Sequence, residues 1–235
     1  MLAPEIPAFL PFFLGGVLAL CTRGPLRGAL LLAIIVLSGA RLWLGPEQVS
    51  VTTQFLQYEL MPYRVDKLSL LFGYIFHIAA FIGVIYSLHV RDTLQQVAAM
   101  LYAGSALGAV FAGDLLTLFV FWELLALTSV FLIWARRTER SYQAGLRYLI
   151  IQVLSGLLLL GGLLVHASQS GSLAFGFIGL SGVAGWLIFS AFGIKCCFPF
   201  LHNWLTDAYP EATPTGTVFL SAFTTKVAVY ARARS

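Results

Sequence analysis

Residues 115–134 form the run LLTLFVFWELLALTSVFLIW, in which Glu123 is the only charged side chain. About 20 consecutive apolar residues are enough for a helix to cross the hydrocarbon core of a bilayer. A charged side chain near the middle of such a helix opposes insertion by roughly 2.5–3.5 kcal/mol. The run therefore predicts a membrane helix, and it identifies Glu123 as a candidate functional residue.

Two more apolar stretches contain a charge in the same way. Lys195 lies in WLIFSAFGIKCCFPFLHNWL at 186–205, and Lys226 lies in TPTGTVFLSAFTTKVAVYARAR at 213–234. Together the three charges oppose insertion by about 8–10 kcal/mol. Ionisable residues inside membrane segments usually move ions or protons, so translocation is the first functional hypothesis.

The composition supports a membrane protein. The chain is 59% hydrophobic and 10% charged, whereas a soluble domain has about 25% charged residues. This leaves too little polar surface to cover a soluble globule. The net charge of +4 comes from arginines in short loops, and no basic run has interleaved aromatics, so nucleic acid is not an expected partner.

Hydrophobic windows predict an all-α, polytopic transmembrane bundle of about eight spans. These lie near 6–20, 28–44, 68–89, 97–113, 115–134, 148–166, 182–205 and 213–232. Arginines follow the first, third and fifth spans, which predicts that those loops are cytoplasmic and the N-terminus is outside. We expect the bacterial cytoplasmic membrane as the location.

Local signals predict where individual helices begin and how one of them packs. Asp114 is placed to cap the helix that starts at 115, and Thr213 is placed to cap the last span, with Pro214 as its first residue. Gly104, Gly108 and Ala112 form a ridge of small residues, so the fourth span should pack closely on a neighbour.

Pro199 follows Lys195 by four residues. A proline inside a helix clashes with the carbonyl four residues earlier, so the seventh span should break just after Lys195. Broken helices at membrane depth line a cavity or are buried in protein. Lys195 is thus a candidate proton carrier, with a snorkelling lysine as the alternative; for Glu123 the alternative is a neutral or structurally paired carboxylate.

Two further residues are weaker candidates for proton transfer. His202 follows the break, where an imidazole can relay protons, although a loop histidine bonded to a carbonyl is the alternative. Lys226 lies off the hydroxyl stripe of its own helix, so we expect its polar partner to come from another helix. Snorkelling to the membrane surface is the rival interpretation.

The motifs of soluble catalysis are missing from the sequence, which has no phosphate-binding glycine loop, nucleophile elbow or metal-ligand cluster. We therefore expect no cofactor and no metal bound by this chain alone. Whether it is part of an enzyme stays open, because a translocase of the NADH:quinone oxidoreductase type is a compatible parent complex.

The sequence resembles the antiporter-like subunits shared by respiratory complex I and the Mrp-type multisubunit Na⁺/H⁺ antiporters. The matching text is VDKLSLLFGYIF…YSLHVRD, FAGDLLTLFVFWELLALTSVFLI and GIKCCFPFLHNWLTDAYPEATPTGTVFLSAFTTKVAVY, which spans about 70% of the chain. The TKVAVYA ending is more similar to the Mrp D-type branch. Relative to the complex I pattern P-x-H-x-W-L-P-D-A, Leu201 is an extra residue and Thr206 replaces the second proline.

The resemblance implies a role for each candidate residue. Glu123 resembles the fifth-helix glutamate that modulates a seventh-helix lysine, and Lys195 matches that lysine, the proton carrier of the family. Lys226 resembles the eighth-helix lysine that passes charge onward. His202 matches the histidine of the broken-helix loop.

Family members have about fourteen helices and two inverted five-helix repeats. By that comparison, residues 1–65 are peripheral helices and a loop, and 66–235 are the first repeat of the translocation domain, without the second. We expect other membrane subunits as partners, a chain that supplies the second repeat, and protons or Na⁺ as cargo. The alternatives are a non-conducting structural subunit and a truncated or split fragment that needs a partner chain.

Overall fold

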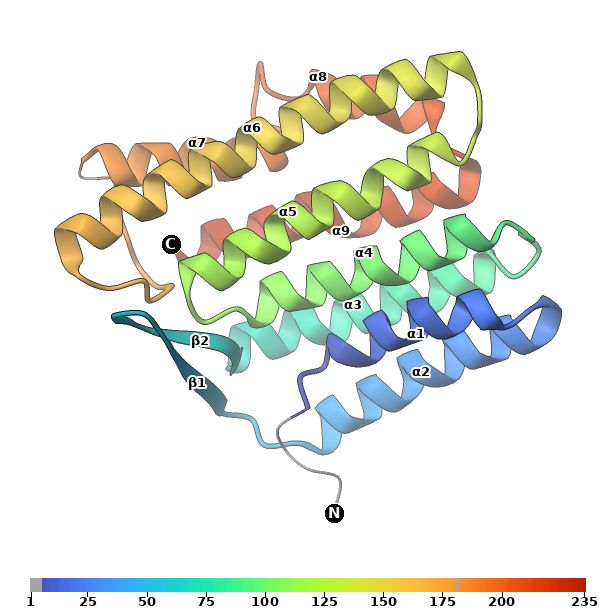
Figure 1. Ribbon diagram of the computed structural model, residues 1–235, viewed down its shortest axis with the longest axis horizontal. Helices are drawn as coiled ribbons and strands as arrows, with labels where there is room; N and C mark the ends of the chain where they lie inside the picture. The colour runs from blue at the N-terminus through green and yellow to red at the C-terminus, as the bar shows by residue number, and fades with distance from the viewer. Residues whose placement is uncertain (1–5, 181) are drawn as a thin grey trace.

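The computed structural model describes residues 6–180 and 182–235, which form a helical bundle with one β-hairpin (Figure 1). The order of elements is α1 (Leu10–Cys21), α2 (Gly24–Leu44), β1 (Val49–Phe55), β2 (Tyr58–Val65), α3 (Lys67–Tyr86), α4 (Thr93–Phe111), α5 (Leu115–Trp134), α6 (Glu139–Ser170), α7 (Val183–Lys195), α8 (Asn203–Ala208), the 3₁₀ turn η1 (Tyr209–Glu211) and α9 (Pro214–Arg234).

The predicted all-α bundle is confirmed, apart from the hairpin. A helix lies in each segment where a span was predicted, and the seventh is divided into α7 and α8. Five helices in the described chain, α2 to α6, are long and apolar enough to cross a membrane, and α1 and α7 are shorter apolar helices. The count of eight spans and the repeat stay predictions.

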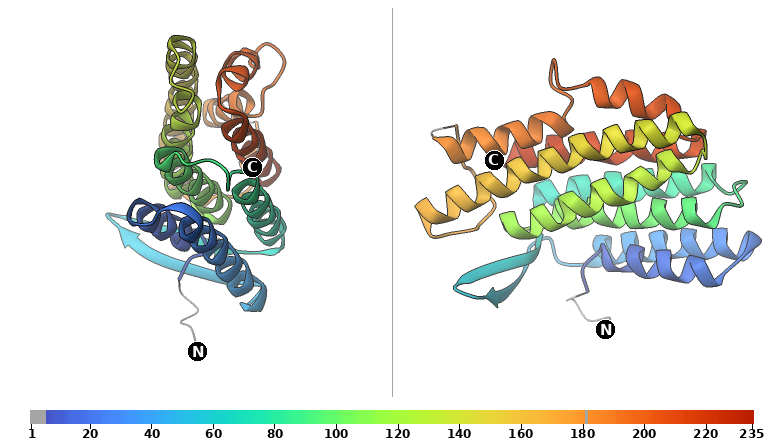
Figure 2. Two further views of the ribbon diagram at one scale, coloured as in Figure 1. Left: turned by 90° about the vertical axis from the view of Figure 1, so that its right-hand side faces the viewer. Right: turned by 45° about the horizontal axis from the view of Figure 1, so that its top comes forward.

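Helix α4 is the centre of the bundle. It packs on α1, α3, α5 and α9, and 83% of its apolar window is buried. The end-on view in Figure 2 shows α1 and α2 on one side of this centre and α7 and α9 on the other. The ridge of small residues explains the close packing, because a methyl group on Gly104 would meet Phe12 of α1 at 3.0 Å, and Gly108 lies directly against Phe121 of α5.

Both predicted helix caps are confirmed. The Asp114 carboxylate accepts a hydrogen bond from the Thr117 amide at 2.7 Å at the start of α5. The Thr213 hydroxyl accepts one from the Gly216 amide at 3.0 Å, and Pro214 is the first residue of α9. Each bond satisfies an amide that a helix start leaves without a partner.

The hairpin β1–β2 replaces the loop that we expected before residue 66. Its turn contains neither glycine nor asparagine, and Leu56 adopts a left-handed backbone with φ of 54°. The hairpin is anchored to the bundle because Asp114 also accepts the Met61 amide at 2.8 Å. Asp114 therefore fixes the hairpin as well as the start of α5.

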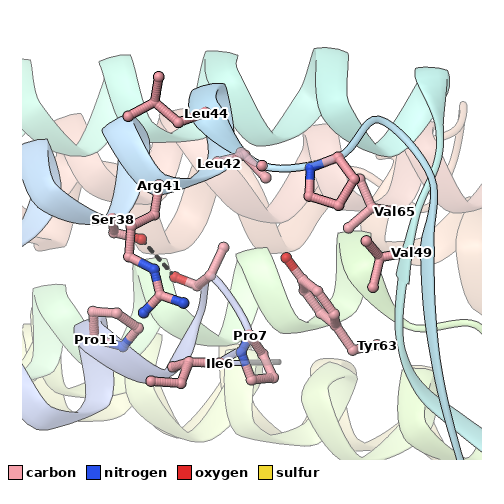
Figure 3. Close-up of a pocket in the computed structure, with 13 residues that line it drawn as sticks. Ile6, Pro7, Pro11, Ser38, Arg41, Leu42, Leu44, Val49, Tyr63 and Val65 are labelled. Carbon is pink, nitrogen blue, oxygen red and sulfur yellow. Dashed lines mark hydrogen bonds between the residues drawn. The ribbon is translucent and has the colours of Figure 1, made fainter. Parts of the chain in front are cut away.

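A cavity of about 330 Å³ lies where the hairpin meets α2 and the segment before α1. Arg41 of α2 and Tyr63 of β2 lie on either side of it (Figure 3). The dashed line in Figure 3 is the hydrogen bond from the Ser38 hydroxyl to the Ala8 carbonyl, 2.8 Å long. None of the four candidate residues for proton transfer is among the described residues that line this cavity.

Candidate functional site

The break in the seventh span lies where the sequence predicted it. Helix α7 ends at Lys195, and the chain does not resume a helix until Asn203. Within the break, Cys197 and Phe200 have left-handed backbones with φ of 59° and 71°. Side chains other than glycine rarely adopt this conformation, and such strain persists only where the surrounding structure enforces it.

Pro199 explains why the helix stops at this lysine. Because proline has no amide hydrogen, it cannot bond the Lys195 carbonyl. In the described chain that carbonyl accepts only the Cys197 thiol, at 3.9 Å. The buried indole of Trp204 donates to the Ile194 carbonyl at 2.9 Å, which ties α8 to the end of α7.

The Lys195 side chain is completely buried, with 0% of its surface exposed. Its amine donates a hydrogen bond to the Trp122 carbonyl of α5 at 2.8 Å. It also lies 4.6 Å from the centroid of the Trp122 indole ring. Both contacts stabilise a cation. A snorkelling lysine would expose its amine at the surface, so the complete burial of Lys195 contradicts that alternative.

Glu123 follows Trp122 in α5 and is half-buried. Its Oε1 atom is buried and has no hydrogen-bond partner in the described chain. Oε1 lies directly against the backbone of α6 at Gly156, in the space that a Cβ would fill. Glu123 and Lys195 interact electrostatically, but the described residues contain no ion pair between them within 4.0 Å. The carboxylate is near the amine without being fixed to it.

Residues of α6 complete the site, and they were not predicted from the sequence. Ser155 accepts the Trp122 indole N–H at 3.0 Å and donates to the Ala191 carbonyl of α7 at 2.7 Å. Gln152 has 0% exposure, and neither polar atom of its amide has a partner in the described chain. Gln152 and Gly156 lie one turn apart on the same helix face. A buried amide in an apolar span is costly, and that signal could have identified Gln152.

The two other candidates differ from the buried Lys195 in being exposed. The His202 side chain, at the residue before α8, makes no hydrogen bond in the described chain, whereas its carbonyl accepts the Leu205 amide at 3.0 Å. Lys226 is also exposed, and its amine donates to the Ser221 carbonyl of its own helix at 2.6 Å. The expectation that another helix would supply this partner is therefore wrong.

Buried hydroxyl groups form two cross-helix contacts that the sequence analysis also missed. The Tyr102 hydroxyl of α4 lies 2.6 Å from the Thr224 hydroxyl of α9. The Tyr148 hydroxyl of α6 lies 2.7 Å from the Ser129 hydroxyl of α5. Because all four side chains are buried, these bonds connect the helices around the site.

The fold and the site together define a class. The chain is a polytopic helical membrane protein with a buried lysine at a broken helix and a half-buried glutamate in the neighbouring helix. Residues 112–235 match the family model described as NADH:quinone oxidoreductase/Mrp antiporter, TM. The chain belongs to this family.

Relatives and solved structures agree with this assignment. The Na⁺/H⁺ antiporter subunit A1 of Staphylococcus aureus (strain bovine RF122 / ET3-1) is 32% identical over 188 residues, which cover 72% of this chain and 23% of the relative. The chain thus spans about a quarter of the length of this relative. The similarity to the Mrp D-type branch stays a prediction, because this relative is an A1 subunit.

Three solved structures share the fold. The Mrp complex from Dietzia sp. DQ12-45-1b aligns with a TM-score of 0.82 and 25% identity, over 95% of this chain and 27% of that chain. The archaeal membrane-bound sulfane sulfur reductase aligns with a TM-score of 0.84 and 22% identity, over 97% of this chain and 40% of that chain. Respiratory complex I from Thermus thermophilus aligns with a TM-score of 0.80 and 20% identity, over 96% of this chain and 52% of that chain.

Proposed function

We propose that this chain is a proton-transferring part of a cation/proton-translocating membrane complex, and that Lys195 carries the proton. The observation that supports this proposal most strongly is the buried Lys195 amine at the break of α7, bonded to a neutral carbonyl at 2.8 Å. A buried lysine is costly to a protein that does not use it. The chain belongs to the NADH:quinone oxidoreductase/Mrp antiporter family, and proton transfer by Lys195 would explain why this cost is retained.

Glu123 is the group that modulates Lys195 in this proposal. An anion brought close to a buried amine favours the ammonium form, and its withdrawal favours release of the proton. Two unit charges 4–6 Å apart interact by about 3–4 kcal/mol at an effective dielectric constant of ~20. Since Glu123 Oε1 has no hydrogen-bond partner in the described chain, no bond to this oxygen opposes the movement of the carboxylate that would alter the protonation of Lys195.

His202 and Lys226 have the roles of proton entry and onward transfer in this scheme. Both side chains are exposed in the chain, so groups on other subunits or on further protein segments would exchange protons with them. The arginine-rich end of the bundle faces the cytoplasm in this proposal, by the positive-inside rule.

The test is proton flux into proteoliposomes that contain the complex with this chain. Lys195→Ala should abolish the flux. Lys67→Ala should not change it, because Lys67 is an exposed lysine at the start of α3. Undiminished flux in Lys195→Ala would refute the proposal and favour a structural subunit that does not conduct.

A further inference from the structure

A groove of about 970 Å³ lies at the end of the bundle where α1 meets α2 and α3 meets α4. Both connections lie at the same end of the molecule in Figure 1, at the right of the view. The groove contains the arginines of two separate segments, Arg23 and Arg27 at the start of α2 and Arg91 before α4. His89 lines it as well, and no carboxylate is among the described lining residues.

Arg27 is the buried basic residue of this groove. Its side chain is 5% exposed, and its guanidinium donates to the Thr22 carbonyl at 2.9 and 2.6 Å and to the Gln96 Oε1 at 3.2 Å. Gln96 in turn donates to the Val90 carbonyl at 2.9 Å. These bonds connect α2 with the α1–α2 connection, with α4 and with the α3–α4 connection, but every acceptor is neutral. A buried cation is left without a counterion in the described chain, at a cost that an anionic ligand would offset.

The other arginines at this end of the bundle have acidic partners. Arg140 pairs with Glu211 at 2.8 Å, and Arg147 pairs with Asp207 at 2.7 Å. Asp92, which follows Arg91 in the sequence, is bonded to Arg137 at 3.0 Å and to the Leu94 amide at 3.0 Å. Surplus positive charge is therefore confined to the groove.

The backbone adds to this charge. The first turn of α2 has no side-chain cap and no acidic residue, so its free amides present the positive end of a 21-residue helix to the groove. The floor is apolar, with Leu32 and Leu88 among the lining residues, and Leu88 is 49% exposed toward the outside of the bundle. Positive charge above an apolar floor matches a phosphate group that continues into an acyl chain.

We propose that this groove binds the phosphate headgroup of an anionic phospholipid, with its acyl chains along α2 and α3. Basic pockets between membrane helices are suited to such headgroups. The chemistry required of the ligand is a negatively charged phosphodiester attached to a hydrocarbon chain. This site is separate from Lys195 and does not depend on the proposed proton transfer.

The test is native mass spectrometry of the purified chain, titrated with dioleoyl phosphatidylglycerol or with dioleoyl phosphatidylcholine. Wild type should bind the anionic lipid about tenfold more tightly than the zwitterionic one. Arg23→Gln with Arg91→Gln should remove this preference, since each basic side chain near an anionic headgroup contributes a several-fold effect. Arg140→Gln with Arg147→Gln removes the same charge outside the groove and should leave binding within about twofold of wild type.

Equal binding of the two lipids by wild type, or equal losses in the two double variants, would overturn the proposal. Inorganic phosphate in large excess should not displace phosphatidylglycerol, and displacement would show a free-oxyanion site instead of a lipid site. The two substituted arginines, Arg23 and Arg91, are exposed, so the fold should tolerate their loss. If the double variant fails to fold, Arg23→Gln and Arg91→Gln are tested singly, and each should weaken phosphatidylglycerol binding about threefold.

Discussion

The amine of Lys195 at the end of α7 donates a hydrogen bond to the carbonyl of Trp122 in α5, at 2.8 Å. The acceptor belongs to the residue directly before Glu123, so the same turn of α5 that binds the amine also carries the carboxylate, and the two are not joined by an ion pair within 4.0 Å in the described chain. The helix break supplies the lysine, α5 supplies both of its neighbours, and α6 supplies the space at Gly156. The site therefore depends on three helices at once.

The first prediction concerns the stability cost of Lys195. Lys195→Met keeps most of the volume and removes a buried charge that has no ion-pair partner in the described chain. Replacing buried charges by apolar groups is often neutral or stabilising, by about 1–4 kcal/mol. The thermal unfolding midpoint in detergent should therefore be unchanged or higher. Lys226→Met, at an exposed position, should not change the midpoint, and a clear decrease in Lys195→Met would show that the lysine is structural.

Gly156 provides a test of the position of Glu123. A methyl group at Gly156 would occupy the space of Glu123 Oε1, so Gly156→Ala should push this flexible carboxyl group into a less favourable rotamer, at a cost of about 0.5–1.5 kcal/mol. Most of this loss should disappear in the double variant with Glu123→Ala, which a double-mutant cycle measures. Gly161→Ala is the control on the same helix, because its methyl group would meet only Leu187, at 3.8 Å. Additive losses in the cycle would contradict the contact.

Trp204 should be needed to hold the break in place. Trp204→Phe removes the hydrogen bond to the Ile194 carbonyl, which then keeps the Cys197 amide, at 3.2 Å. The expected cost in thermal or denaturant unfolding is about 0.5–1.5 kcal/mol, the net value of one hydrogen bond. Trp186→Phe is the matched control, since Trp186 is 55% exposed. Equal stability of the two variants would show that the bond does not support the break.

Asp66 predicts a pH dependence of stability outside the membrane helices. Burial alone raises the pKa of this carboxyl, but hydrogen bonds from the Ser69 amide and from Arg234, which is 2.7 Å away, outweigh it, so its pKa lies below the ordinary value. A carboxylate with a lowered pKa in the folded state stabilises the fold at pH values above its unfolded pKa. That stabilisation is lost as the pH falls through the folded value.

The measurement for Asp66 is the unfolding midpoint of wild type and Asp66→Asn across the acidic range. Wild type should be more stable at neutral pH, and the difference should shrink below about pH 4. The effect will be modest, because a third of the side chain is exposed, 34%, and solvent screens its charge. A difference independent of pH would show that Asp66 acts without its charge.

Much of the fold could be predicted because its signals are local. The run of apolar residues before Trp134 and the cap at Asp114 both depend on neighbours in sequence, as does the break caused by Pro199. The hairpin could not be predicted in this way, because its turn at Leu56 lacks the glycine or asparagine that usually marks a left-handed turn. Its anchor to Asp114 connects residues far apart in the chain.

The site was only partly predictable for the same reason. Lys195 and Glu123 were visible as charges in apolar runs, whereas the contacts of Gln152 and Ser155 depend on how α6 packs against α5 and α7. The partner of Lys226 was mispredicted because an exposed lysine can bend back to a carbonyl of its own helix. Sequence spacing does not report such a choice of rotamer.

The central claim is that Lys195 gains and loses a proton during transport. Lys195→Arg tests it most directly, because a guanidinium keeps the positive charge but does not release its proton in proteins. Proton flux into proteoliposomes that contain the complex should fall to the level of Lys195→Ala. Flux at the wild-type level in Lys195→Arg would contradict the claim, since a fixed positive charge would then be sufficient.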